Sequence, residues 1–195
     1  MRGLLIALMA LAAWPSWAED RPTYEQIVRQ FEAISFSDEY GPPRGWFTRW
    51  ERVPVRILSL GVPVAEIEQV ATEIRSLTGL EVVLVGRGNS HNVAVSFADR
   101  CYMDGRGAPV KVTIQLDRLH RCLYAELFQA VGPANDACHY RPSLFCDGEP
   151  NQTPTWADRI IMKATFDSRL RVGMKPPEAM PIAREIIREL YDTGG

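Results

Sequence analysis

Apolar residues recur every three or four positions in five stretches of the chain, the spacing of helices that bury one face. In the first stretch Ile27, Phe31 and Ile34 share a face, and Thr23 stands where a helix cap is expected. The predicted helices cover residues 23–36, 64–77, 119–132, 155–166 and 177–191, and Gly79 ends the second of them.

Four further stretches are rich in β-branched residues or alternate apolar with polar positions, which indicates strands. They cover residues 53–59, 80–85, 92–97 and 110–116. One helix crosses between the first two strands, so we expect these two to be parallel, while short turns join the later strands, at least one of which we expect to be antiparallel. The predicted fold class is α/β (α+β): a mixed sheet of about four strands with helices packed on it, and a helical C-terminal part.

Residues 1–18 have the pattern of a secretory signal peptide. Arg2 supplies a positive charge, an apolar run follows over residues 4–13, and a small-x-small cleavage motif ends at Ala18. The apolar run is short for a membrane span, so we expect cleavage rather than anchoring. Removal leaves 177 residues, which we expect to form a single domain over 19–195, with a sheet part at about 19–132 and a helical part at about 133–195.

Composition narrows the possible classes of protein. The chain is 46% hydrophobic and 24% charged, with 22 basic against 24 acidic residues. Disorder, a polytopic membrane protein and a strongly basic nucleic-acid binder all fit these figures poorly. Loss of the signal removes one basic residue and leaves a net charge of −3. We therefore expect a periplasmic or secreted protein with no nucleic-acid partner and no transmembrane segment after signal removal.

The cysteines are Cys101, Cys122, Cys138 and Cys146, all beyond the signal. An exported chain meets an oxidising compartment, so an even number of cysteines favours two disulfides, and there is no C-x-x-C pair to indicate a zinc or redox site. Four cysteines allow three pairings. We favour Cys138 with Cys146, which closes a short loop, and Cys101 with Cys122, which links a strand region to the start of a helix.

The predicted helix at 119–132 directs a carboxylate towards the core. At about 100° per residue, Leu119, Leu123 and Leu127 form one apolar stripe, and Glu126 falls within roughly 20° of Leu119. Such a glutamate is either a hydrogen-bonded core residue or a general base whose pKa is tuned by burial. In the first case Glu126 and Gln129 form a polar pair that fixes the helix on the sheet.

Residues 125–135 read A-E-L-F-Q-A-V-G-P-A-N. They resemble the zinc helix of the zincin metallopeptidases, in particular the metzincin branch, which reads H-E-x-x-H-x-x-G-x-x-H or ends in D. Glu126 and Gly132 match this motif, whereas Ala125 and Gln129 stand where the motif has histidines. The resemblance implies a zincin-like domain.

Two later segments extend this resemblance. Residues 143–147 look like the segment that carries the methionine turn of that family, with Phe145 in the place of methionine, and residues 153–161 are similar to the start of its last helix. The chain also resembles a family of exported proteobacterial proteins of unknown function, many described as putative lipoproteins. This second likeness covers roughly residues 53–180 and rests on three blocks in one order: A-E-L-F-Q-A-V-G-P-A-N-D, P-S-L-F-C-D and D-S-R-L-R-V-G-M.

The replaced histidines bear on activity. Zinc in a hydrolytic site needs three protein ligands and an open position for water. Ala125 has no donor atom and the amide of Gln129 is a weak ligand, so the resemblance implies the fold without the protease mechanism and without a cofactor. The alternative is a nonstandard zinc site built from Asp136 and His139 together with Glu126.

Two functional hypotheses follow. The leading one is an exported, non-catalytic domain, a pseudo-metallopeptidase, that binds an unknown envelope protein or ligand in a cleft under the helix at 119–132. The candidate cleft residues are Glu126, Gln129, Asn135 and Asp136. The alternative is a metal-dependent, peptidase-like hydrolase that uses Glu126 as general base.

Overall fold

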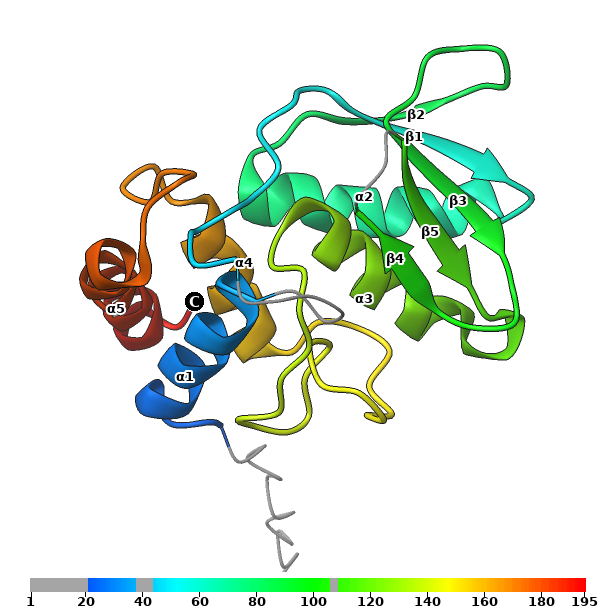
Figure 1. Ribbon diagram of the computed structural model, residues 1–195. Coiled ribbons are helices and arrows are strands. Elements are labelled where there is room, and N and C mark those ends of the chain that lie inside the picture. Colours follow the sequence, from blue (N-terminus) through cyan, green and yellow to red (C-terminus); the bar gives the residue numbers. More distant parts are fainter. Residues whose placement is uncertain (1–20, 38–43, 106–108) are drawn as a thin grey trace, which may run out of the picture.

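The computed structural model describes residues 21–37, 44–105 and 109–195, and within them five α-helices accompany a five-stranded sheet (Figure 1). In chain order the elements are α1 (Tyr24–Ser35), β1 (Val55–Leu60), α2 (Val64–Thr78), β2 (Val82–Val85), β3 (Val93–Phe97), β4 (Tyr102–Asp104), β5 (Val110–Ile114), the 3₁₀ turn η1 (Leu116–Arg118), α3 (Leu119–Val131), α4 (Trp156–Phe166) and α5 (Pro176–Thr193). All five predicted helices are present, and their ends differ from the predicted ones by at most two residues. The predicted signal, residues 1–18, lies outside the described residues.

The strands form one mixed sheet in the order β2-β1-β3-β5-β4. The mixed α/β class and the parallel pairing of β1 with β2 are confirmed. β3 also runs parallel to β1, on the side opposite β2, so β2 and β3 do not form a hairpin, and β5 runs parallel to β3. The expectation that one of the predicted later strands is antiparallel is therefore wrong: the antiparallel strand is β4, which was not predicted and pairs with β5 at the edge of the sheet.

The predicted number of strands, about four, is one too low. The additional strand is β4, which covers only Tyr102–Asp104. Three residues are too few to show the alternation of apolar and polar positions by which a strand is recognised in a sequence. This short edge strand is important, because it forms one side of the candidate site described below.

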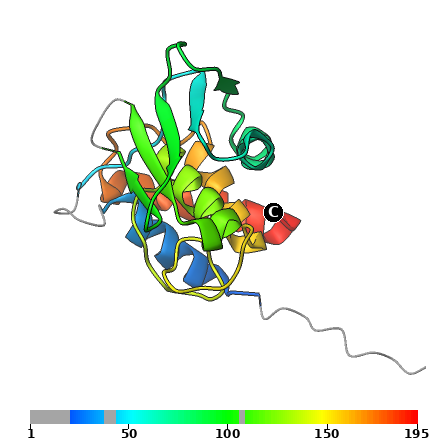
Figure 2. The same ribbon diagram turned by 90° about the vertical axis from the view of Figure 1, so that its right-hand side faces the viewer.

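The helices α2 and α3 cover one face of the sheet, as Figure 2 shows from the side. Apolar side chains at alternate positions of the central strands are almost fully buried: Ile57, Val93, Val95, Val112 and Ile114 are at most 1% exposed. This alternation is the pattern of a sheet packed on one face. It places α3 against β5 and β4, where the two elements contact each other directly.

The other three helices, α1, α4 and α5, pack together beside α2 and α3 (Figure 1). Thr23 caps α1 with its side chain, as predicted, and Thr155 caps α4 in the same way. One hydrophobic cluster includes Ile114 of the sheet, Ile160 of α4 and Ile187 of α5. The core is therefore continuous from the sheet to the C-terminal helices.

Both favoured disulfides are present. Cys101, which precedes β4, is bonded to Cys122 of α3, and Cys138 is bonded to Cys146 in the connection between α3 and α4. The first disulfide ties the edge strand to the helix beside it. Among the described residues, no helix has the length and apolar character needed to cross a bilayer.

Candidate functional site

A cavity of about 200 Å³ lies between α3 and the edge strand β4. Its lining includes Ala125, Glu126 and Gln129 from α3, Tyr102 from β4, and Asp136 from the segment after α3. Three of the four predicted cleft residues, Glu126, Gln129 and Asp136, are thus brought to one cavity. They meet there because positions 125, 126 and 129 share one side of a helix, and α3 is held against β4 by the Cys101–Cys122 disulfide.

Gln129 and Asp136 interact directly inside this cavity. The amide Nε2 of Gln129 donates a hydrogen bond of 2.8 Å to Oδ1 of Asp136. Gln129 is 5% exposed and Glu126 is 9% exposed. Asn135 has a different role, because its side chain donates to the carbonyl oxygen of Ala33 in α1, at 3.1 Å, and does not line the cavity.

Arginine side chains line the end of the cavity near the start of α3. They are Arg100, Arg118 and Arg121. Arg121 is largely buried, and its Nη2 donates to the carbonyl oxygen of Cys146 at 2.8 Å. Burial lowers the pKa of Arg121, and the like charge of Arg118 lowers it further, while Asp136 and Asp147 act in the opposite direction. Arg121 therefore anchors the wall, whereas Arg100 and Arg118 are exposed at the rim.

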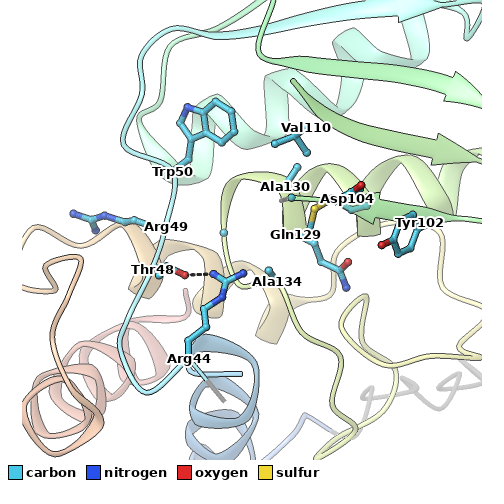
Figure 3. A pocket seen from close by; sticks show the side chains of 13 residues that line it. Arg44, Thr48, Arg49, Trp50, Tyr102, Asp104, Val110, Gln129, Ala130 and Ala134 are labelled. Carbon is cyan, nitrogen blue, oxygen red and sulfur yellow. Dashed lines mark hydrogen bonds between the residues drawn. The ribbon is translucent and has the colours of Figure 1, made fainter. Parts of the chain in front are cut away.

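A second cavity, of about 210 Å³, continues past Gln129 towards the end of α3 (Figure 3). Tyr102 and Gln129 line both cavities, while Ala130, Arg44 and Trp50 line only the second. Figure 3 shows Arg49 pointing away from this space, because its guanidinium donates to the carbonyl oxygens of Thr165 and Asp167. We call these two neighbouring cavities together the α3–β4 groove.

The wall opposite β4 is an irregular segment, residues 132–155, that is held by polar anchors from two helices. From α1, the buried Gln30 donates to the carbonyl oxygen of Ala137 at 2.5 Å and accepts from the backbone N–H of His139 at 2.8 Å. The Cys138–Cys146 disulfide closes the same loop. These contacts supply partners to backbone groups that have no place in a helix or strand.

The second anchor is Asp158 of α4, which is fully buried. Its Oδ1 accepts hydrogen bonds from the hydroxyls of Tyr140, at 2.8 Å, and Ser143, at 2.7 Å. Its Oδ2 accepts from the backbone N–H groups of Leu144, at 3.1 Å, and Thr155, at 2.9 Å. Burial and the charge of Asp158 raise the pKa of Tyr140 well above its usual range. Four donors thus hold one carboxylate, and Leu144 at the groove is fixed by it.

Sequence reasoning missed three of these residues: Gln30, Arg121 and Asp158 in its anchoring role. Gln30 and its loop partners are 107 to 115 residues apart, so no local pattern relates them. Asp158 does carry a local signal, since it stands three residues after Thr155 in a capping box. That signal accounts for one of its four hydrogen bonds and gives no indication of the others.

The residues of the groove do not fit a zinc ion. Ala125 has no ligating atom, and Gln129 offers only the oxygen of a neutral amide, a weak zinc ligand, while its Nε2–H donates to Asp136. Glu126 and Asp136 line the same cavity, but His139 does not line it. Across the described ranges, no three His, Cys, Asp or Glu residues come together in a group that could hold a metal ion. The ligand set proposed from the sequence, Glu126 with Asp136 and His139, is therefore not assembled.

The fold and groove define a mixed α/β domain with a polar groove between its edge strand and its central helix. Residues 108–185 match the model of a protein family described as "Protein of unknown function (DUF2927)". This segment contains β5, α3, the irregular wall and α4. Neither the curated proteins nor the solved structures include a match to this chain.

Proposed function

We propose that this chain is an exported, non-catalytic binding domain of the cell envelope, and that it takes an extended segment of a partner protein in the α3–β4 groove. The observation that carries the proposal is the groove itself: two cavities of about 200 and 210 Å³ that share Tyr102 and Gln129 along one edge strand. Binding sites are commonly concave regions with a few convergent polar groups.

The edge strand supports an extended ligand. β4 is the last strand of the sheet in the described part of the chain, and its pairing with β5 uses only one of its sides. The other side of an edge strand presents backbone groups that an added strand can pair with. Along α3, the groove runs from Arg118 to Gly132, which is about 21 Å at the helical rise. An extended segment of roughly six residues has that length.

The proposed location rests on two features. The N-terminal pattern of residues 1–18 is that of a signal peptide. The two disulfides are typical of proteins that mature in an oxidising compartment. The resemblance of residues 125–135 to a zincin helix without its histidines supports a domain that binds but does not cleave.

A peptide-selection experiment tests this function. The chain from residue 19 onwards is used to select peptides from a displayed random library, and fluorescence anisotropy measures the affinity of the selected peptides. Ala125→Trp and Ala130→Trp each place an indole in one of the two cavities, and His120→Trp places the same side chain on an exposed position of α3. We expect the first two variants to weaken binding by about ten-fold or more, the loss of roughly 1.4 kcal/mol of contact, and the third to leave it unchanged.

Recovery of no binder, or binders that are indifferent to both cavity-filling changes, would contradict the proposal. The hydrolase hypothesis is tested with the same peptides. Cleavage in the presence of zinc that is lost in Glu126→Gln would show that the groove is catalytic, and the non-catalytic function would then be wrong.

A further inference from the structure

The second edge of the sheet is β2, at the end opposite β4 (Figure 1). In the described part of the chain, β2 pairs with β1 and with no other strand. Its four residues read V-V-L-V, without a charge or a proline. Edge strands of soluble proteins commonly carry a charge or a proline, which prevents pairing with another chain. The strand β2 is therefore suited to accept a further strand.

The backbone groups of Leu84 face the open edge of β2. The N–H of Val55 in β1 donates to the carbonyl oxygen of Glu81 at 2.7 Å, and Val55 is in register with Val82. In a parallel pair, the two neighbours of the residue in register bond to the adjacent strand, so Glu81 faces β1 and Val82 faces away from it. Because successive residues of a strand alternate, Leu84 faces away as well.

Two contacts agree with this alternation and leave Leu84 at the centre of the edge. Arg75 of α2 donates from its guanidinium to the carbonyl oxygen of Val82 at 2.7 Å. Beyond the strand, the carbonyl oxygen of Gly86 accepts from the backbone N–H of Asn89 at 3.2 Å, within a turn. Leu84 lies midway between these two occupied carbonyl groups. A pairing at this edge is therefore centred on Leu84.

The side chains of this edge are complementary to a second copy of themselves. Glu81 directly precedes β2 and Arg87 lies in the turn that follows it; both are exposed, and no ion pair joins either of them to another described residue. When two copies of β2 run antiparallel with Leu84 opposite Leu84, Glu81 of each copy lies opposite Arg87 of the other. Between these positions, Val83 lies opposite Val85. One two-fold axis thus creates two ion pairs and two apolar pairs.

Other registers lose this match. Outward backbone groups must lie opposite one another in an antiparallel pair, so the register can change only in steps of two residues. The nearest alternatives place Glu81 opposite Val85, or Arg87 opposite Val83. Each puts a charge against an apolar side chain, and the register centred on Leu84 is therefore favoured.

We propose that this protein forms a two-fold dimer by antiparallel pairing of β2 with β2 of a second copy, centred on Leu84. The pairing joins the two five-stranded sheets into one continuous sheet. A single short strand offers less than the roughly 1,200 Å² of a standard stable interface, so we expect a reversible dimer with a dissociation constant of roughly 1–100 µM. The inference is independent of the proposed function, because β4 lies at the other edge and the α3–β4 groove stays open in both copies.

Sedimentation equilibrium of the chain without residues 1–18 tests the dimer. Over a range from roughly 1 µM to 1 mM, the wild-type protein should change from monomer to dimer. Glu81→Arg and Arg87→Glu each replace two attractive pairs by two repulsive ones, and each should weaken the dimer at least ten-fold. Glu32→Arg makes the same change of charge at an exposed position of α1 and should leave the dimer unchanged.

Mixing the two charge variants tests the pairing itself. In a mixed dimer of Glu81→Arg with Arg87→Glu, one copy carries arginine at both positions and the other carries glutamate at both, so both ion pairs form again. We expect the equimolar mixture to dimerise about as tightly as the wild-type protein. The double variant, which carries both changes in one chain, should also dimerise. A merely structural role of either residue would not produce this rescue.

The backbone pairing is tested by Leu84→Pro, which removes the outward N–H at an edge position where proline is tolerated. With a circular dichroism spectrum like that of the wild type, this variant should be monomeric where the wild type is dimeric. Four results would overturn the proposal: a wild-type protein that stays monomeric throughout, a dimer that both charge reversals leave intact, single variants that remain monomeric when mixed, and a folded Leu84→Pro variant that still dimerises.

Discussion

Asp158 is expected to hold the irregular wall of the groove in place, and its removal should be among the most destabilising single changes in this chain. The carboxylate is fully buried and accepts four hydrogen bonds, two from side-chain hydroxyls and two from backbone N–H groups. A hydrogen bond to a charged group contributes about 1.5–3 kcal/mol, and a buried donor left without a partner costs about 1–3 kcal/mol.

These contributions are not additive, because the loop can relax and water can enter the space. For Asp158→Ala we expect a loss of about 3–5 kcal/mol, because four neutral donors lose a charged acceptor and some of them stay buried without a partner. Asp158→Asn retains the shape and one acceptor oxygen but turns an NH₂ group towards two donors, so we expect a loss of about 2–4 kcal/mol. Either value is a large fraction of the stability of a typical domain, roughly 5–15 kcal/mol.

Urea denaturation followed by circular dichroism, with the disulfides intact, measures both losses. Asp192→Ala, at an exposed aspartate near the end of α5, is the control and should change the free energy of unfolding by less than about 0.5 kcal/mol. A loss below about 1 kcal/mol for Asp158→Ala would refute the assignment of Asp158 as the anchor of the wall.

Three further predictions concern other residues of the wall and the groove. Gln30→Leu should cost about 1–3 kcal/mol in the same denaturation assay, because the carbonyl oxygen of Ala137 and the N–H of His139 lose their bonds to the Gln30 side chain. The exposed neighbour Glu32→Leu should cost less than about 0.5 kcal/mol. The folded-state pKa of Tyr140 lies above its unfolded value of about 10, so the folded state keeps this proton longer and its stability should fall as the pH rises from about 10 towards the folded-state pKa; stability measured against pH should fall less steeply in Tyr140→Phe. Combining Ala125→His with Gln129→His places two imidazoles one helical turn apart on the groove, and this double variant should bind zinc, measured by calorimetry, more tightly than either single variant.

Local patterns predicted the helices and most strands because each of these elements depends on residues close in sequence. The strand β4 was not predicted, because its three residues are too few to show the alternation of apolar and polar positions that identifies a strand. Its extended conformation depends on its pairing with β5. The position of Glu126 towards a buried face was predictable from the helical angle alone. Its partnership in a groove with Tyr102 was not, since that depends on which strand forms the sheet edge.

The irregular wall was the least predictable part of the site. Its shape depends on Gln30 of α1 and Asp158 of α4, whose contacts form only after the helices have packed. From the sequence alone, a polar residue that is buried in a helix cannot be told from a polar residue on the helix surface. Its partner, which is distant in sequence, is what identifies it as buried. The cysteine pairing was easier to predict, because Cys138 and Cys146 are separated by only 8 positions and close a short loop.

The segment that matches the protein family, residues 108–185, does not contain everything that its own structure requires. It includes Cys122 but not Cys101, and it includes the loop held by Gln30 but not Gln30 itself. It also ends within α5 and omits β4, so one side of the groove is absent. A protein produced from this segment alone would carry Cys122 without its partner Cys101, and α3 without the strand that lies beside it across the groove. The segment matched by the family model is therefore shorter than the folded unit in which its disulfide and its loop anchor are complete, since Gln30 and Cys101 both lie before it.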